Sequence, residues 1–316
     1  MTARIFIDGE AGTTGLQIRH RLSARTDLTL LNVAPTARKD PQARAALLNS
    51  ADLVVLCLPD DAAREAVALI ENPTVRVIDA STAHRVAEGW VYGFPELSPM
   101  QATHIAAAQR VSNPGCYPTG ALALVRPLLA AGLLPRDFPL TVNAVSGYSG
   151  GGRRLIDRYE APESLQPLTS PLWVYGLDLE HKHVAELQQH AGLTMRPLFV
   201  PSVGRFAQGM IVQVPLQLWS LPAQPTVADV HAALVAAYRD SPFISVASLA
   251  EASQLEQLEA QTLNGTNQMR LYVFGNDARR QAVLAAVLDN LGKGAAGAAV
   301  QNLNLMLDRP PTLGLQ

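Results

Sequence analysis

The residue best suited to chemistry in this 316-residue chain is Cys116, one of only two cysteines, the other being Cys57. Cys116 follows the turn-forming residues 113–115 and precedes the apolar run 121–125, whose spacing is typical of a helix. We therefore expect its thiol in the first turn of a helix, where backbone N–H groups without helical partners favour the thiolate. An arbitrary cysteine is most often a small buried residue. A thiolate in this position can instead attack an activated acyl carbon, so we predict that Cys116 is a nucleophile.

Two histidines in the second half of the chain can move protons. His181 and His183 flank Lys182 and precede or open a helix that continues through residues 187–190. An imidazole exchanges protons near neutral pH, and a lysine can hold a phosphate. We predict that His181 or His183 is the acid/base group, and the sequence does not decide between them. Residues two apart do not share a helix face, so no metal site is predicted.

A glycine-rich stretch follows the predicted strand 140–146. Residues 147–154 contain four glycines and two arginines, so they form either a mobile loop that reaches over an anionic substrate or a plain connection. The predicted substrate-binding residues are Asn113, Ser149, Gly150, Arg153 and Lys182.

The first residues of the chain predict a nucleotide site. A short apolar strand at 5–7 is followed by Gly9, Gly12 and Gly15 and then by the helical spacing of 16–22. Glycines at this strand-to-helix turn allow close approach of a pyrophosphate to a helix N-terminus, although a glycine trio alone is a weak signal.

The second apolar strand, 28–33, indicates which dinucleotide is bound. An acidic residue at its end would favour NAD, but the chain has Thr36 and Arg38 in a basic turn. A hydroxyl and a cation suit a 2′-phosphate, so we predict NADP; an ordinary solvated turn is the alternative.

Two further apolar strands, 53–58 and 75–79, alternate with helices. Cys57 is interpreted as packing within the first of them, and residues 59–61 as the cap of a helix at 62–70. This alternation predicts a doubly wound, Rossmann-like α/β parallel sheet, which binds ligands beyond the carboxyl ends of its strands. The predicted cofactor-binding residues in this part of the chain are Gly9, Gly12, Thr13, Thr14, Gly15, Thr36, Arg38, Pro59 and Ser81.

The remainder of the chain predicts an α+β catalytic domain. Its strand candidates are 198–203, 209–218, 268–274 and 283–288, the last of which could equally be a helix, and residues 227–238 have helical periodicity. The small-residue segment 292–306 is expected to form a helix that returns to the first domain. The predicted domains are 1–112 with 292–316 for NADP binding and 113–291 for catalysis.

The overall charge excludes several classes of partner. With 25 basic and 27 acidic residues, the formal net charge is −2, which gives no broad attraction to nucleic acid or to an anionic membrane. Two cysteines are too few for a disulfide framework, and no signal peptide or transmembrane segment is recognisable. We expect a cytoplasmic protein that acts on a small molecule.

Seven ordered blocks resemble the shorter type of N-acetyl-gamma-glutamyl-phosphate reductase, a family within the aspartate-semialdehyde dehydrogenase-like superfamily. The resemblance spans nearly the whole chain. The blocks are residues 6–15, 79–85, 90–96, 112–119, 146–152, 181–183 and 299–306.

The resemblance implies NADPH as cofactor, an acyl-phosphate substrate in arginine biosynthesis, and a homodimer or homotetramer. It makes residues 113–291 the catalytic and dimerisation domain. It places Cys116 on the family's nucleophile, His181 or His183 in its catalytic histidine region, and Asn302 near the nicotinamide. Two alternatives stay open at this point: an acyl-phosphate reductase of the aspartate semialdehyde or aminoadipate pathway, and a non-catalytic dinucleotide-sensing protein.

Overall fold

The computed structural model describes residues 2–32 and 40–316, and the chain divides into two compact units. Unit 1 contains Met1–Gly115 and Ala295–Gln316, and unit 2 contains Cys116–Gly294. The sequence predicted both boundaries between the units three residues earlier, after residues 112 and 291. Unit 1 is therefore discontinuous in sequence, and unit 2 is one uninterrupted segment.

Unit 1 is built on a parallel sheet of six strands in the order β2-β1-β3-β4-β6-β5. All four residues of β3 are buried, as expected for a strand that is covered on both faces. The predicted doubly wound sheet is thus confirmed. The strands are β1 (Ala3–Asp8), β2 (Leu28–Leu31), β3 (Leu53–Leu56), β4 (Arg76–Asp79), β5 (Val91–Tyr92) and β6 (Arg110–Ser112).

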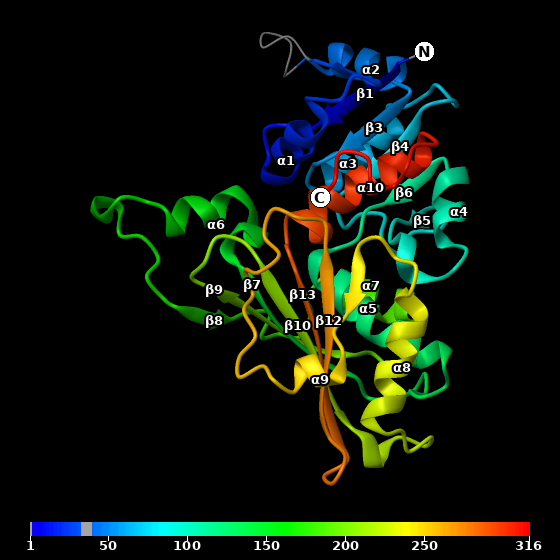
Figure 1. Ribbon diagram of the computed structural model, residues 1–316. Helices are drawn as coiled ribbons and strands as arrows, with labels where there is room; N and C mark the ends of the chain where they lie inside the picture. The colour runs from blue at the N-terminus through cyan, green and yellow to red at the C-terminus, as the bar shows by residue number, and fades with distance from the viewer. Residues whose placement is uncertain (1, 33–39) are drawn as a thin grey trace. The chain divides into compact units, whose positions relative to one another are not determined.

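Helices cover the two faces of this sheet, and each face has its own core. Ile5 packs with residues of α1 and α10, whereas Phe6 packs with residues of α2 and α3, because successive side chains of a strand point to opposite faces. The red α10 in Figure 1 therefore supplies part of the core of unit 1 although it follows unit 2 in the sequence. The helices are α1 (Thr13–Leu22), α2 (Pro41–Ser50), α3 (Asp60–Ala68), α4 (Gln101–Ala107) and α10 (Gly297–Met306).

The predicted cap of the third helix was wrong. The helix begins at Asp60, and no side chain caps it. The Asp60 carboxylate instead accepts hydrogen bonds from the backbone N–H of Thr82 (2.9 Å) and from its hydroxyl (2.5 Å). A contact with the loop after β4 has replaced the local one.

Unit 2 is built on a mixed sheet of seven strands in the order β11-β12-β13-β10-β7-β9-β8, which confirms the predicted α+β architecture. Residues 283–288 belong to a strand, since β13 pairs with β10 and with β12 over eight residues each. The strands are β7 (Thr141–Gly147), β8 (Leu172–Val174), β9 (Leu198–Gly204), β10 (Met210–Gln217), β11 (Ile244–Val246), β12 (Met269–Asn276) and β13 (Gln281–Leu288).

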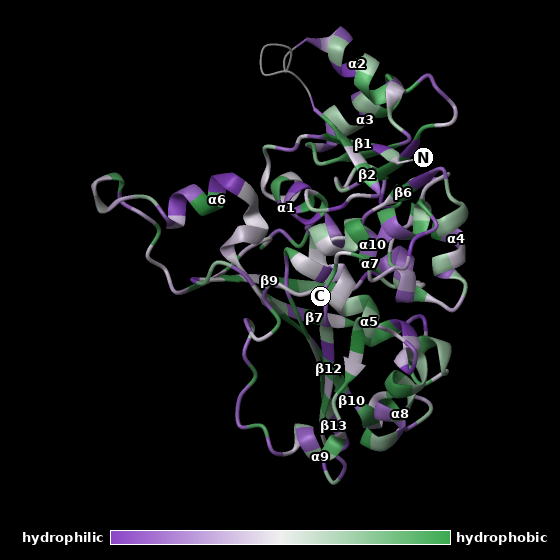
Figure 2. Cartoon of the chain, turned by 45° about the horizontal axis from the view of Figure 1, so that its top comes forward, coloured by the Kyte–Doolittle hydropathy of each residue, from purple (hydrophilic) through white to green (hydrophobic). Residues whose placement is uncertain are grey.

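One face of this sheet is packed against helices α5 and α8, and the other is open (Figure 1). Met210, Val212 and Val214 of β10 are buried, whereas Gln213 and Pro215 between and after them are exposed. Figure 2 shows α5 as a largely apolar helix and α6 as a largely hydrophilic one. The helices are α5 (Cys116–Ala130), α6 (Gly152–Tyr159), α7 (His183–Ala191), α8 (Val227–Tyr238) and α9 (Leu249–Ala252).

Two predicted segments have a different structure. Residues 148–151 form a 3₁₀ turn that leads into α6, so the expected glycine loop is mostly helical. Residues 292–296 form a π-helical turn before α10, where one continuous helix was expected. Within the described part of the chain, no helix is long and apolar enough to cross a membrane. Further 3₁₀ turns among the described residues are Pro95–Leu97, Glu163–Leu165 and Leu218–Ser220.

Candidate active site

The glycine turn after β1 leaves no room for a side chain at Gly9 or at Gly15. Gly9 has φ +85°, and a Cβ there would overlap the carbonyl oxygen of Cys57. A Cβ on Gly15 would lie 2.5 Å from the carbonyl oxygen of Gly9. Gly12 precedes α1 without any side-chain cap, so the helix begins with the N–H groups of Thr13, Thr14 and Gly15. A cradle of this kind fits a phosphate group.

The structure brings the other predicted cofactor residues to the same sheet edge. Pro59 and Ser81 follow the carboxyl ends of β3 and β4; β3 lies next to β1 in the sheet, and β4 lies next to β3. Ser81 is buried, and its N–H and hydroxyl both donate to the Asp79 carboxylate, at 2.9 and 2.7 Å. Its side chain therefore shapes the loop after β4. Thr36 and Arg38 lie outside the described residues.

Two buried asparagines of unit 1 bind each other. Asn302 donates from Nδ2 to the carbonyl oxygen of Gly93 (2.8 Å) and to Asn113 Oδ1 (3.0 Å), and Asn113 donates from Nδ2 to the carbonyl oxygen of Ala295 (3.0 Å). Both amide atoms of Asn113 are thus used within the chain, which favours a structural role over the predicted contact with substrate. Asn302 Oδ1 is buried and has no hydrogen-bond partner in the described part of the chain. It can accept a bond from a bound group.

The two thiols of the chain lie in different surroundings. Cys116 is the first residue of α5, as predicted, and is partly exposed. Cys57 follows β3 and is partly exposed as a residue, but its thiol is desolvated. This desolvation, together with the negative charges of Asp79 and Asp8, raises the pKa of Cys57 to about 12. Cys57 is therefore a poor nucleophile at neutral pH.

The predicted histidines gather around the residue next to the thiol. The ring of Tyr117 meets those of His181 and His183 edge-on, with centroids 6.1 and 5.8 Å apart, and the two imidazoles lie 4.7 Å from each other. The backbone N–H of His183 donates to His181 Nδ1 (3.2 Å), so a neutral His181 carries its proton on Nε2. His183 is buried against Leu187 and Phe199.

Two tyrosines that the sequence interpretation missed belong to the same cluster. Tyr175 donates to the hydroxyl of Tyr117 (3.2 Å), which donates to the carbonyl oxygen of Ser202 (3.1 Å). Burial raises the pKa of Tyr117 well above its usual range and that of Tyr175 to about 12, and a charged Cys116 adds to both effects. Both phenols are therefore neutral donors at pH 7. The position of Tyr117 beside Cys116 was the available signal; Tyr175 had none.

The remaining predicted residues are more dispersed. Ser149 is buried and accepts a hydrogen bond from Asn290 Nδ2 (2.9 Å), whereas Gly150 is exposed. Arg153 is exposed and pairs with Asp157 (2.9 Å), and Lys182 is exposed at the residue before α7. Among the described residues, no cluster of side chains could hold a metal ion.

Two sequence families match successive parts of the chain. Residues 18–105 match the family described as semialdehyde dehydrogenase, NAD binding domain, and residues 116–290 match semialdehyde dehydrogenase, dimerisation domain. Among solved structures, aspartate semialdehyde dehydrogenase II from Vibrio cholerae complexed with ASA superimposes with a TM-score of 0.72. It covers 98% of this chain and 99% of its own at 15% identity, which is a likeness of fold alone.

Curated relatives are much more similar in sequence. N-acetyl-gamma-glutamyl-phosphate reductase of Trichormus variabilis is 57% identical, with 99% of both chains covered. The protein of the same name from Burkholderia cenocepacia is 58% identical with 96% of both covered, and N-acetyl-gamma-glutamyl-phosphate reductase 2 of Pseudomonas putida is 55% identical with 97% of both covered. The glycine turn, the thiol at the start of α5 and this identity along almost the whole length agree, and the chain belongs to the N-acetyl-gamma-glutamyl-phosphate reductase family.

Proposed function

We propose that this protein catalyses the NADPH-dependent reductive dephosphorylation of N-acetyl-L-glutamyl 5-phosphate to N-acetyl-L-glutamate 5-semialdehyde, a step of arginine biosynthesis. The observation that carries the proposal is the partly exposed Cys116 at the first residue of α5, beside the cluster of Tyr117 and the two histidines. The identity of 55–58% to the named reductases supports this substrate over aspartyl or aminoadipyl phosphate. A dinucleotide sensor needs no nucleophile.

The reaction begins at the sulfur of Cys116. Its thiolate attacks the acyl carbon of the substrate, the bond from that carbon to the phosphate oxygen breaks, and inorganic phosphate leaves with the electron pair. A thioester remains on Cys116. Bound NADPH supplies the hydride that reduces this carbonyl carbon, and the resulting thiohemiacetal expels the thiolate and releases the aldehyde. Dividing the reduction into two steps lowers the barrier of each.

The groups around Cys116 stabilise charge and move protons in this scheme. Backbone N–H groups at the start of α5 donate to the oxyanion that forms on the acyl carbon. His181 or His183 protonates and deprotonates that oxygen near neutral pH. The proposed contacts for the substrate remain Ser149, Gly150, Arg153 and Lys182. The exposed cations of Arg153 and Lys182 are suited to the phosphate and carboxylate groups of the substrate.

Residues of unit 1 hold the cofactor. The turn from Gly9 to Gly15 would hold the pyrophosphate at the N-terminus of α1, and Asn302 Oδ1 would be available to accept a hydrogen bond from the cofactor. Thr36 and Arg38 are proposed to bind the 2′-phosphate. Unit 1 is accordingly the NADP-binding domain and unit 2 the catalytic and dimerisation domain.

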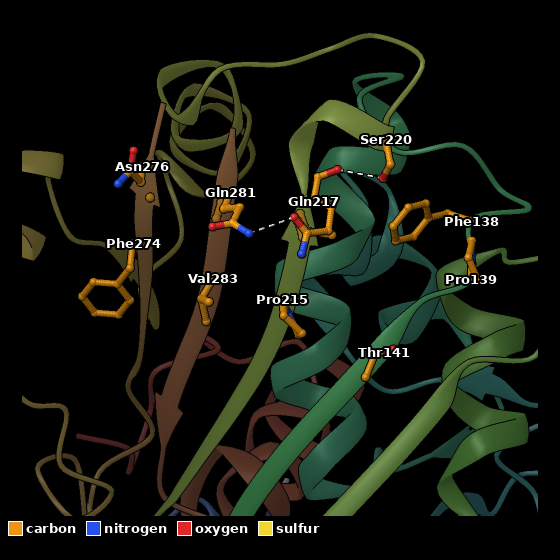
Figure 3. A pocket seen from close by; sticks show the side chains of 13 residues that line it. Phe138, Pro139, Thr141, Pro215, Gln217, Ser220, Phe274, Asn276, Gln281 and Val283 are labelled. Atoms are coloured by element: carbon orange, nitrogen blue, oxygen red, sulfur yellow. Dashed lines mark hydrogen bonds between the residues drawn. The ribbon is translucent and has the colours of Figure 1, made fainter. Parts of the chain in front are cut away.

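The open face of the unit 2 sheet is the proposed contact between two copies of the chain. Phe274, Val283 and Pro215 lie opposite one another on β12, β13 and β10 and line an open depression of about 730 Å³ (Figure 3). A second copy would cover this apolar surface, in agreement with the dimerisation family that matches the segment. The compartment is proposed to be the cytoplasm, where a catalytic thiol stays reduced.

The assay runs the reaction backwards. Phosphate-dependent reduction of NADP⁺ is followed at 340 nm (about the absorbance maximum of NADPH) with N-acetylglutamate semialdehyde and, separately, with aspartate semialdehyde. We expect turnover with the first aldehyde only, its loss in Cys116→Ser with NADP⁺ binding intact, and its retention in the matched control Cys57→Ser. Turnover by Cys116→Ser, or no activity of the wild type with either aldehyde, contradicts the proposal.

A further inference from the structure

An acidic residue and an amide, Asp289 and Asn290, directly follow strand β13 and have no part in the chemistry described above. Both are almost completely buried, with 0% and 1% of their surface exposed. A carboxylate is seldom buried to this degree unless hydrogen bonds compensate for the water it has lost. The pair is therefore expected to organise the segments that surround it.

The Asp289 carboxylate accepts three hydrogen bonds, each from a different segment. Its Oδ2 accepts from Gln208 Nε2 (2.5 Å) and from the backbone N–H of Gly265 (2.8 Å), and its Oδ1 accepts from the backbone N–H of Leu291 (2.8 Å). Two loops that are distant in sequence and the start of the π-helical turn are thus held by one side chain. No neutral side chain of this size accepts at both of its ends.

Asn290 extends the same network to the segment after β7. Its Oδ1 accepts from the backbone N–H of Gly209 (2.7 Å), and its Nδ2 donates to the hydroxyl of Ser149 (2.9 Å). The backbone N–H of Ser149 also donates to the carbonyl oxygen of Ala207 (3.0 Å). Ser149, one of the proposed substrate contacts, is therefore fixed on both sides.

The backbone of Asp289 reaches the thiol through the π-helical turn. Its carbonyl oxygen accepts from the N–H of Gly294 (3.0 Å), the i to i+5 bond that defines this rare turn. Gly294 packs directly on Cys116, since a Cβ on Gly294 would lie 2.8 Å from the Cys116 Cβ and 3.3 Å from its Cα. The backbone of Gly294 therefore lies against Cys116, and its hydrogen bond to Asp289 fixes its position.

We propose that Asp289, together with Asn290, is a positioning residue for the Cys116 thiol: it fixes the π-helical turn that contacts Cys116 and, through Asn290, the hydroxyl of Ser149. The proposal rests on Cys116 being the nucleophile. Small displacements of a reacting atom, of about 1 Å, reduce rates on the order of a hundredfold, so the network is expected to affect the chemical step more than cofactor binding.

The test is Asp289→Asn in a Cys57→Ser background, so that Cys116 is the only thiol. An asparagine keeps the shape but turns its NH₂ group toward N–H donors, which disrupts one end of the network. We expect kcat to fall about 10- to 100-fold, with the Kd for NADP⁺ within about twofold. The pH profile of iodoacetamide alkylation of Cys116 should also change, which a loss of stability alone does not produce.

The matched control is Asp229→Asn, which removes a carboxylate from the same unit. Asp229 closes a capping box with Thr226 at the start of α8, so its replacement lowers stability but should leave kcat and the alkylation profile unchanged. If Asp289→Asn does not fold, Gly294→Ala is the second variant. The added methyl group displaces the π-helical turn relative to Cys116, so the same loss of kcat is expected.

Three outcomes decide the question. A lowered kcat with a changed alkylation profile supports the proposal. A kcat within twofold of the parent, or a loss that matches the unfolded fraction while the alkylation profile is unaltered, overturns it. Full activity of Cys116→Ser would instead contradict the proposed function itself, so the two failures are distinguishable.

Discussion

The different surroundings of the two thiols predict that one of them can be labelled selectively in the folded protein. An unperturbed thiol has a pKa of 9.0 and that of Cys57 is about 12, a difference of three units. At pH 8 the thiolate fraction of Cys57 is therefore about one in ten thousand, instead of about one in ten. The reagent iodoacetamide reacts with the thiolate, so this difference slows alkylation about a thousandfold.

A second effect opposes part of this difference. A thiolate of higher pKa is intrinsically more nucleophilic, with a Brønsted coefficient of about 0.4–0.5. Between pKa 9 and about 12, this makes the Cys57 thiolate itself about 15 to 30 times more reactive. The net expectation is that Cys57 reacts about 30 to 60 times more slowly in the folded protein than an ordinary thiol.

Peptide mass spectrometry after timed alkylation at pH 8 measures each cysteine separately. Alkylation of Cys116 should parallel the loss of activity, while Cys57 stays largely unmodified. In urea, both cysteines should react at the rate of an ordinary thiol, which controls for the reagent. The reasoning is refuted if Cys57 in the folded protein reacts within fivefold of its rate in urea, or if inactivation follows the modification of Cys57.

Two further predictions concern stability and assembly. The hydrogen bonds of Arg25 hold the pKa of Asp27 at about 2, below its usual 3.8, so this carboxylate stabilises the fold above pH 4 and loses that effect as the pH falls toward 2. Asp27→Asn should lower the free energy of unfolding by about 2 kcal/mol at pH 7 in urea titrations, and an equal cost at pH 3 would contradict this. Pro215→Arg places a charge on the open sheet face and should give monomers in light scattering. The control Val235→Arg, on the exposed side of α8, should leave the dimer intact. A Pro215→Arg dimer as tight as that of the wild type would exclude this face as the dimer contact.

Much of the fold could be predicted because its strongest elements have simple patterns. Buried parallel strands such as β3 are continuous apolar runs, and a glycine turn before a helix marks the start of α1. The strands β5, β6, β8 and β11 were missed, since two or three residues carry too little periodicity. Helix α6 was missed because its glycine-rich start was interpreted as a loop.

The candidate site was less predictable, because its groups meet only through tertiary contacts. Cys116 and the histidines had local signals, but the hydrogen bond between Tyr175 and Tyr117 joins residues 58 positions apart. The Asp60 carboxylate bonds to Thr82, 22 positions away, in preference to its own helix. A pattern of neighbouring residues contains no information about such partners. For the Asp289 network, the only local signal was the position of Asp289 and Asn290 directly after the apolar strand β13.

The return of α10 to unit 1 has a consequence for how the chain is made. Ala299, Val300 and Leu303 complete one core of that unit, yet they are synthesised only after all of unit 2. At about 5–20 residues per second, translation of residues 116–294 alone takes on the order of ten seconds or more, during which the apolar surface around Ile5 and Ile18 lacks its cover. The core of unit 1 can thus be completed only after unit 2 has been synthesised, and until then nascent unit 1 is a natural client for chaperones.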